Sequence, residues 1–512
     1  MSSGISTLRN VALLSAASYL ELAFSLILGV VIARSLGSAE FGHYAFAVWA
    51  SGTLITLCNN ALTMSSIKFV AEARGAGQAE VAAALHHRLH QWQTISSLVV
   101  LGAFAIGAII HPPSEWQDTI SIVLPLLLIG AWGRSGYTMM AALGKGYERF
   151  EITGIASLAS VLANLLLVTA LAYVGGTMLD FFAVYAVCGL LQNLSARILL
   201  RRFGIHPKPL LLSKHLTQRL HRHLLQTGVL VLLATVADRT FEILLLRKFW
   251  TPEAVGYFAI AGSLTKGATY LLAGALSSVL LPTMSRAFGS GGTTAVVRML
   301  HASIRYYWFI GVMIAGLGVI MAPGAVRLFY GPQFEAAIPA VVVNLAISGF
   351  VLVSAALNAF HASSDHQGDR IKISGIALLV NLISSFALVP AFGLTGALAS
   401  LAITNMVSVY ISWTFVRRAE GFELPTGAML RVLLAALAAV AVALICNLLM
   451  PGRFTFIPAG LLFVGAYLAG SAVLRAWTRT DFETIAEVAR RLGPGGNAMV
   501  PLIEAAADRF AA

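Results

Sequence analysis

The chain has 512 residues, a formal net charge of +12, 58% hydrophobic residues and only 11% charged residues. Soluble domains average about 25% charged residues, so this composition excludes a soluble globular protein and indicates an integral membrane protein. The basic balance is explained by loops facing anionic lipids. Nucleic-acid binding is excluded, because it needs a basic patch on a folded domain and no soluble segment here is large enough to provide one.

Apolar runs of 18 or more residues predict about fourteen transmembrane helices, since roughly 20 apolar residues cross the hydrocarbon core of a bilayer. In chain order the predicted spans are 11–33, 41–63, 92–111, 117–142, 152–174, 178–200, 225–248, 254–281, 301–323, 336–360, 373–392, 394–416, 428–450 and 456–478. The first run is too long for a signal-peptide core and lacks a small-x-small cleavage site, so we expect it to remain as a span. The predicted fold class is an all-α integral membrane protein.

The distribution of basic residues predicts the orientation of these spans. With the N-terminus inside, most of the 34 Lys and Arg residues fall in cytoplasmic loops and tails. This is the positive-inside pattern, so both termini are predicted to be cytoplasmic. The longest external loop, about 324–335, is too short for an extracytoplasmic catalytic domain.

Several charged residues lie inside predicted spans. They are Glu21, Arg134, Asp238, Arg239, Glu242 and Lys266. Each costs roughly 2.5–3.5 kcal/mol at a helix centre, and such residues usually face a protein interior or a wet cavity on a substrate or ion path. A structural ion pair is the alternative explanation for each, most directly for Arg239 and Glu242, which are i,i+3 neighbours. Together they indicate a polar cavity within a membrane bundle.

Two of these charges are expected to meet across a hairpin. Asp238 and Lys266 lie equally far from Pro252, about 21 Å at about 1.5 Å rise per residue, and so share one depth in the membrane. Because an unpaired charge at that depth is costly, we expect Asp238 and Lys266 to approach each other.

Other polar residues at membrane depth offer neutral hydrogen bonds. Asn59, Asn60, Thr269 and Tyr270 could bind sugar hydroxyls, with ordinary interhelical bonding as the alternative. The three cysteines all fall inside predicted spans, so neither a disulfide framework nor a metal site is predicted. No phosphate-binding loop of the G-x-x-x-x-G-K type occurs, which argues against ATP hydrolysis. We predict no cofactor, no catalytic residue and no enzymatic activity.

The chain also repeats itself. The loop before span five contains Arg149, Ile152, Gly154, Ile155 and Ala156, and at a constant offset the loop before span eleven contains Arg370, Ile373, Gly375, Ile376 and Ala377. Chance similarity between apolar segments is the alternative, but the shared Arg and Gly favour a repeat. Parallel repeats predict two six-span lobes with a substrate site at their interface. The predicted division is 1–200 and 225–416 for the lobes, 201–224 for a basic linker, 428–478 for an additional helix pair and 479–512 for an amphipathic tail.

Four segments resemble the signature of bacterial polysaccharide flippases. They are Ala33-Arg34-Ser-Leu-Gly37-Ser-Ala-Glu-Phe41-Gly42-His-Tyr44, Pro282-Thr-Met-Ser285-Arg286, Phe329-Tyr330-Gly331-Pro-Gln-Phe334-Glu-Ala336 and Pro390-Ala-Phe-Gly393-Leu-Thr-Gly396-Ala397. The chain is similar to the polysaccharide-transporter branch of the multidrug, oligosaccharidyl-lipid and polysaccharide exporter superfamily. That branch includes O-antigen (lipopolysaccharide) and exopolysaccharide repeat-unit flippases. The resemblance implies a two-lobe bundle in the bacterial inner membrane that moves an undecaprenyl-diphosphate-linked oligosaccharide to the outer leaflet.

The charged residues fit such a substrate. Lys266 and Arg239 are the first candidates for binding the diphosphate, and Arg134 is the next. Glu21, Asp238 and Glu242 would bind sugar hydroxyls, a coupling Na⁺ or a proton. The expected partners are the lipid-linked oligosaccharide, bilayer lipids and a polysaccharide polymerase or co-polymerase. The alternatives are a Na⁺- or H⁺-coupled multidrug antiporter of the same superfamily, or a membrane glycan polymerase or ligase.

Overall fold

The computed structural model describes residues 2–113, 116, 118–237, 240–363, 367–449, 452, 454–491 and 500–510, and all regular elements in these ranges are helices. The chain forms two compact units, Met1–Gly256 and Tyr257–Ala512. The finer division into lobes, linker, helix pair and tail stays a prediction.

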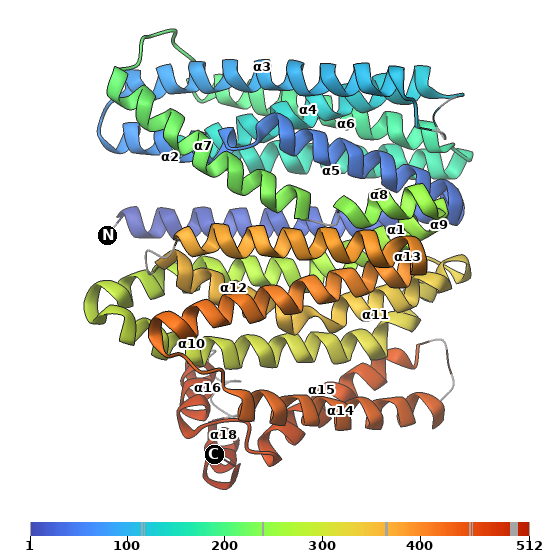
Figure 1. The fold of residues 1–512 in the computed structure, drawn as a ribbon, viewed down its shortest axis with the longest axis vertical. Coiled ribbons are helices and arrows are strands. Elements are labelled where there is room, and N and C mark those ends of the chain that lie inside the picture. The colour runs from blue at the N-terminus through green and yellow to red at the C-terminus, as the bar shows by residue number, and fades with distance from the viewer. Residues whose placement is uncertain are drawn as a thin grey trace. The chain divides into compact units, whose positions relative to one another are not determined.

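The first unit is a bundle of long apolar helices (Figure 1). Its helices are α1 (Ser2–Asn59), α2 (Leu62–Gly75), α3 (Ala79–Ile110), α4 (Ile120–Gly146), α5 (Phe150–Val174), α6 (Met178–Arg202), α7 (Lys214–Ala237) and α8 (Thr240–Phe249). Helix α9 (Pro252–Thr265) begins in this unit. Helix α4 packs along α6 and also contacts α2, α3 and α1, so the residues of α4 lie at the centre of the unit.

Close packing of α4 on α6 depends on glycines at every third position of α4. A Cβ placed on Gly133 would lie 2.6 Å from the carbonyl carbon of Gly189, and one on Gly136 would lie 2.4 Å from Nδ2 of Asn193. Small residues of this kind let membrane helices approach until their backbones touch. The contact therefore fixes the register in which the polar side chains of α4 and α6 face each other.

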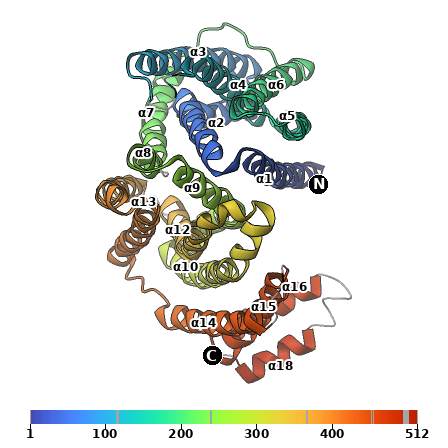
Figure 2. The same cartoon turned by 90° about the vertical axis from the view of Figure 1, so that its right-hand side faces the viewer.

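The second unit continues from α9 through a short π-helix, η1 (Lys266–Tyr270). Its other helices are α10 (Leu271–Phe329), the 3₁₀ turn η2 (Pro332–Ala337), α11 (Ile338–Ala346), α12 (Ser348–Ser363), α13 (Gln367–Glu420), α14 (Thr426–Leu449), α15 (Phe456–Val473), α16 (Arg479–Arg491) and α18 (Val500–Phe510). Helices α14 and α15 pack on each other and on α10, and α16 packs on α18 (Figure 2). Helices α16 and α18 both lie in the segment 479–512, for which an amphipathic tail is predicted.

In the described ranges, ten helical segments are long and apolar enough to cross a membrane. Two of them each contain two predicted spans: Leu20–Asn59 has Gly37 at φ 78°, and Asp369–Arg418 has Gly393 at φ 57°. A positive φ is readily adopted by glycine, so each glycine bends a continuous helix between two spans. The all-α membrane class is confirmed, and these bends reconcile the ten segments with a larger number of crossings.

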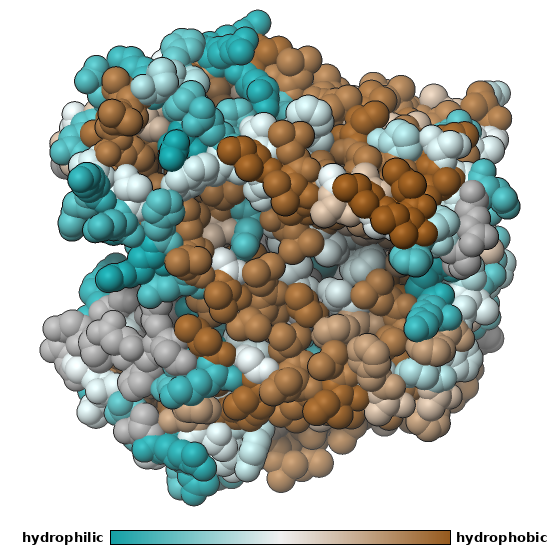
Figure 3. Space-filling model, turned by 45° about the horizontal axis from the view of Figure 1, so that its top comes forward, coloured by the Kyte–Doolittle hydropathy of each residue, from teal (hydrophilic) through white to brown (hydrophobic). Residues whose placement is uncertain are grey.

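Predicted spans seven and eight are not among those ten segments. The described residues of span seven form two helices, α7 and α8, and span eight contains η1 between α9 and α10. In the described residues, the irregular segment η1 begins at Lys266, one of the charged residues in these two spans. On the face seen in Figure 3, hydrophobic side chains occupy the middle and hydrophilic ones gather toward the left and right edges, as expected for a bilayer-spanning surface.

The α4–α6 contact gives a direct test of this packing. Gly133→Val should lower the stability of the protein by about 1–3 kcal/mol, the usual cost of overpacking, because its side chain would meet the Gly189 backbone. Gly107→Ala on α3 is the control, since its Cβ meets nothing within 4 Å. Thermal unfolding followed by tryptophan fluorescence measures both, and an unfolding temperature that drops equally in the two variants would contradict the packing argument.

Candidate functional site

The first unit holds an arginine at membrane depth that stacks on an aromatic ring. The guanidinium carbon of Arg134 on α4 lies 3.9 Å from the ring centre of Tyr185 on α6. Its Nη2 donates to the Tyr185 carbonyl at 3.5 Å, while its buried Nε has no hydrogen-bond partner among the described residues. A cation–π contact of this kind contributes about 0.5–2 kcal/mol. That offsets only part of the insertion cost of roughly 2.5–3.5 kcal/mol.

Neighbouring groups hold both side chains in place. The aliphatic part of the Arg134 side chain lies directly against Gly189. A Cβ at Gly189 would lie only 3.0 Å from Cγ of Arg134, so this contact requires a glycine. The Tyr185 hydroxyl donates to Ser51 Oγ at 3.3 Å, and its ring stacks on Phe182 with centroids 5.7 Å apart. Three helices, α1, α4 and α6, therefore orient the arginine.

A buried hydrogen-bonded cluster from α1, α3 and α4 is centred on Ser135, the residue that follows Arg134. Asn59 Nδ2 donates to Ser135 Oγ at 3.0 Å, and Gln93 Nε2 donates to Ser135 Oγ at 2.9 Å and to Ser97 Oγ at 3.0 Å. All four residues are buried, and Asn59 Oδ1 has no hydrogen-bond partner among the described residues. The structure thus places Asn59 in interhelical bonding, which was the alternative to a sugar contact.

The other predicted residues of the first unit lie elsewhere. Asn60 lies in the turn between α1 and α2 with φ 33°, and Glu21 is exposed on α1, close enough to Tyr137 to act on it electrostatically. Glu242 is fully buried in the first turn of α8. A carboxylate in the first turn of a helix is favoured by the helix dipole, so α8 itself helps to hold this charge.

In the second unit, Lys266 opens the π-helix η1 and is exposed. Thr269, one turn later, is buried and its hydroxyl lies 2.6 Å from that of Ser348. Tyr270 closes the same π-helix. Short π-helical segments inside α-helices often occur at functional sites, so the irregular backbone at Lys266 agrees with a role for this segment.

Asp238 and Arg239 lie outside the described residues. The expected approach of Asp238 to Lys266 therefore stays a prediction, and so does any neutralisation of Glu242 by Arg239. Among the described residues, no ion pair includes Lys266 or Arg134.

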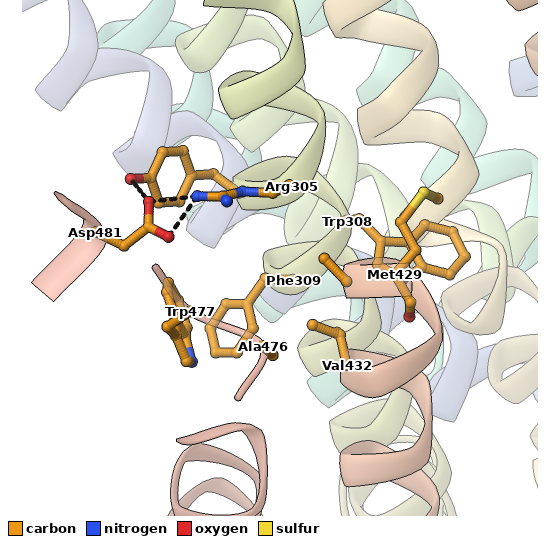
Figure 4. A pocket seen from close by; sticks show the side chains of 10 residues that line it. Arg305, Trp308, Phe309, Met429, Val432, Ala476, Trp477 and Asp481 are labelled. Atoms are coloured by element: carbon orange, nitrogen blue, oxygen red, sulfur yellow. Dashed lines mark hydrogen bonds and ion pairs between the residues drawn. The ribbon is translucent and has the colours of Figure 1, made fainter. Parts of the chain in front are cut away.

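Two pockets in the second unit contain none of the predicted residues. One, of about 330 Å³, lies between α10, α14 and the start of α15 and includes Arg327 and Asn447. The other is lined by Arg305, Trp308 and Phe309 of α10 together with α14 and the segment after α15 (Figure 4).

The pocket of Figure 4 contains an ion pair that the sequence did not predict. Arg305 and Tyr306 on α10 both donate to the Asp481 carboxylate on α16, which also accepts from the backbone and hydroxyl of Thr478. The side chains of Arg305 and Asp481 are only 17% and 4% exposed. This pair ties the start of the tail to α10.

The Asp481 contacts predict how docking of the tail depends on pH. Burial opposes ionisation of Asp481, but the hydrogen bonds from Thr478 and Tyr306 and the charge of Arg305 outweigh it and hold its pKa below the usual aspartate value. A lowered carboxyl pKa contributes stability that is present above the unfolded value, about 3.9, and is lost as pH falls through the folded value.

Hydrogen exchange of residues 479–491 should therefore stay slow from pH 7 to pH 5 in the wild-type protein. Asp481→Asn should exchange faster throughout this range, because it lacks the charge that pairs with Arg305. Arg479→Gln is the control, since its pairs with Glu483 and Asp508 are exposed. Wild-type protection that is already lost at pH 5 would contradict a lowered pKa.

Sequence reasoning missed Tyr185, the Gln93–Ser97–Ser135 cluster and the Arg305–Asp481 pair. A signal for Tyr185 was available: the glycines at 130, 133 and 136 indicate a close helix neighbour beside Arg134. The pair Arg305–Asp481 joins residues distant in the chain, and nothing local in the sequence indicates it.

These features describe a multi-pass helical membrane protein with charged and hydrogen-bonding groups inside its bundle. The polysaccharide biosynthesis protein family matches residues 7–288, more than half of the sequence. The chain belongs to this family, which confirms the resemblance drawn from its sequence motifs.

Individual relatives agree with this assignment. The chain is 25% identical over 372 residues to the probable lipid II flippase MurJ of Rhizobium meliloti (strain 1021). The match covers 67% of this chain and 66% of that protein, just under two thirds of its length.

Solved structures show the same fold. The lipid II flippase MurJ in an inward closed conformation superimposes with a TM-score of 0.70 at 14% identity, covering 90% of this chain and 98% of that one. An inward-facing multidrug resistance MATE family transporter of the MOP superfamily gives a TM-score of 0.63 at 14% identity, covering 78% and 94%. The fold is therefore that of the MurJ and MATE transporters.

Proposed function

We propose that this protein flips an undecaprenyl-diphosphate-linked oligosaccharide repeat unit from the cytoplasmic to the outer leaflet of a bacterial inner membrane. In this proposal both termini are cytoplasmic and the product enters synthesis of a surface or extracellular polysaccharide. The match to the polysaccharide biosynthesis protein family carries the proposal. One relative is a probable lipid II flippase, and lipid II belongs to the same class of lipid-linked substrate.

The chemistry of such a substrate explains the polar groups at membrane depth. Its diphosphate needs cations, its sugars need hydrogen-bonding groups, and its lipid tail can stay in the bilayer. Arg134 and Lys266 are cations without an ion-pair partner among the described residues. Arg239 is the third cation of the proposal, while Glu21, Asp238 and Glu242 would take sugar hydroxyls or a coupling Na⁺ or H⁺.

Alternating access would move the substrate head past the bilayer core. We propose that irregular helix segments allow this motion, namely the bends at Gly37 and Gly393 and the π-helix at Lys266. A polymerase or co-polymerase would receive the flipped unit. The protein acts in this scheme as a transporter, with no covalent step.

A multidrug antiporter is the second candidate, because a MATE transporter shares the fold. Antiport would use the buried carboxylate Glu242 for ion coupling. Deleting the gene separates the two: accumulation of a lipid-linked sugar facing the cytoplasm supports the flippase, while drug sensitivity with normal glycan supports the antiporter.

Lys266 provides the sharpest test of the flippase. Lys266→Ala should reduce glycan export about tenfold or more, because charge-assisted hydrogen bonds contribute about 1.5–3 kcal/mol and a tenfold change corresponds to about 1.4 kcal/mol. Lys266→Arg should retain part of the export, since the charge remains. Complementation of the deletion strain with quantification of surface glycan measures both.

Lys372→Ala is the matched control, because that lysine is exposed in the same unit and pairs with Asp369 at 3.1 Å. Its export should equal that of the wild type. Immunoblots of the membrane fraction establish equal protein levels. Full export by Lys266→Ala would remove Lys266 from the mechanism.

A further inference from the structure

Arg134 is held in a way that leaves its hydrogen-bond donors available. A guanidinium has five N–H donors. Among the described residues, Arg134 makes one hydrogen bond, to the Tyr185 carbonyl at 3.5 Å, a distance beyond the usual range for such bonds. Its Nε is buried without a partner. The arginine is thus oriented but poorly satisfied, and a buried donor in that state favours an incoming acceptor.

The group that orients it carries no negative charge. Tyr185 contacts the guanidinium through its ring, 3.9 Å from the guanidinium carbon, while its hydroxyl is engaged with Ser51. A carboxylate in this place would neutralise the arginine and occupy its donors. An aromatic ring stabilises the cation by its quadrupole and covers one face only, so the full positive charge and the edge of the guanidinium remain.

We propose that Arg134 is a diphosphate-binding residue of the first unit and that Tyr185 is its positioning residue. This inference rests on the proposed function and assigns the substrate's anionic group to a particular pair. The ligand chemistry is a phosphate or diphosphate whose oxygens accept two parallel N–H bonds from the guanidinium edge. The intended ligand is the diphosphate of a prenyl-linked substrate.

The arrangement is built by the fold. The backbones of α4 and α6 are in contact at Gly133 and Gly189. Because Gly189 has no side chain, the aliphatic part of Arg134 can lie beside it. The stacking of Phe182 on the Tyr185 ring and the hydrogen bond of the Tyr185 hydroxyl to Ser51 hold this ring in place. Five residues on three helices thus fix the position of one cation.

The test uses the full-length protein in phosphatidylcholine nanodiscs titrated with farnesyl diphosphate, with farnesol as the probe that has the tail alone. Arg134→Ala should weaken farnesyl diphosphate binding tenfold or more and leave farnesol binding unchanged. Arg202→Ala is the control, because this arginine is exposed at the end of α6; its affinity should match the wild type. Equal affinity of Arg134→Ala and wild type would overturn the site.

Three substitutions of Tyr185 test the positioning role. Tyr185→Phe keeps the ring and should bind within about twofold of wild type, whereas Tyr185→Leu should lose several-fold. Tyr185→Glu offers Arg134 a carboxylate and should lose tenfold or more, with an unfolding temperature equal to or above that of wild type. If Tyr185 were only structural, its substitutions would lower stability and affinity together. That result would overturn the positioning role of Tyr185. If Tyr185→Glu does not fold, equal affinity of the Phe and Leu variants overturns it.

Nanodiscs containing phosphatidylglycerol distinguish a substrate diphosphate from an ordinary lipid phosphate. Farnesyl diphosphate affinity that is unchanged by phosphatidylglycerol supports the proposal, while competition that disappears in Arg134→Ala assigns the residue to bilayer phospholipid and overturns it. If diphosphate binding depends on Arg134 but deletion of the gene leaves glycan export normal, the proposed function is wrong and this inference stands. If the deletion strain loses glycan export, the wild-type gene restores it and diphosphate affinity does not depend on Arg134, this inference is wrong and the proposed function stands.

Discussion

The cost of a charged group at membrane depth is the constraint on which the interior of this protein depends. Each such charge costs roughly 2.5–3.5 kcal/mol on insertion scales, and the structure meets it in different ways. Arg134 stacks on an aromatic ring, Glu242 lies in the first turn of a helix, and Lys266 lies where the helix becomes irregular. The ring that compensates Arg134 introduces no opposite charge.

A buried cation that is stabilised by a neutral partner keeps its charge, whereas a cation in a structural ion pair does not; the proposed site depends on this difference. Arg305 and Asp481 show the structural case: both are largely buried, and the carboxylate accepts from two residues of α10 and from Thr478. Breaking such a buried pair is strongly destabilising, because it leaves an uncompensated charge. Arg134 has a partner, Tyr185, that holds it without cancelling its charge, which is what the proposed anion-binding role requires.

The fold was largely predictable because apolar runs of sufficient length admit few structures in a bilayer. Span boundaries came from hydropathy, and the bends at Gly37 and Gly393 lie between predicted spans that share one continuous helix. The site was less predictable. Asn59 was singled out as a polar residue at membrane depth, but its partner Ser135 could not be found from the sequence, because a serine in an apolar run indicates no particular partner.

The ranking of cations shows where sequence reasoning stops. Lys266 and Arg239 were placed before Arg134 because charge density in spans seven and eight is visible in the sequence. The value of a cation for binding depends instead on what surrounds it, and Tyr185 reaches Arg134 only because Gly133 and Gly189 bring α4 and α6 to backbone contact. That contact joins residues about fifty positions apart and depends on how α4 and α6 pack. The partner of Arg134 is therefore set by helix packing and could not be found from the local sequence.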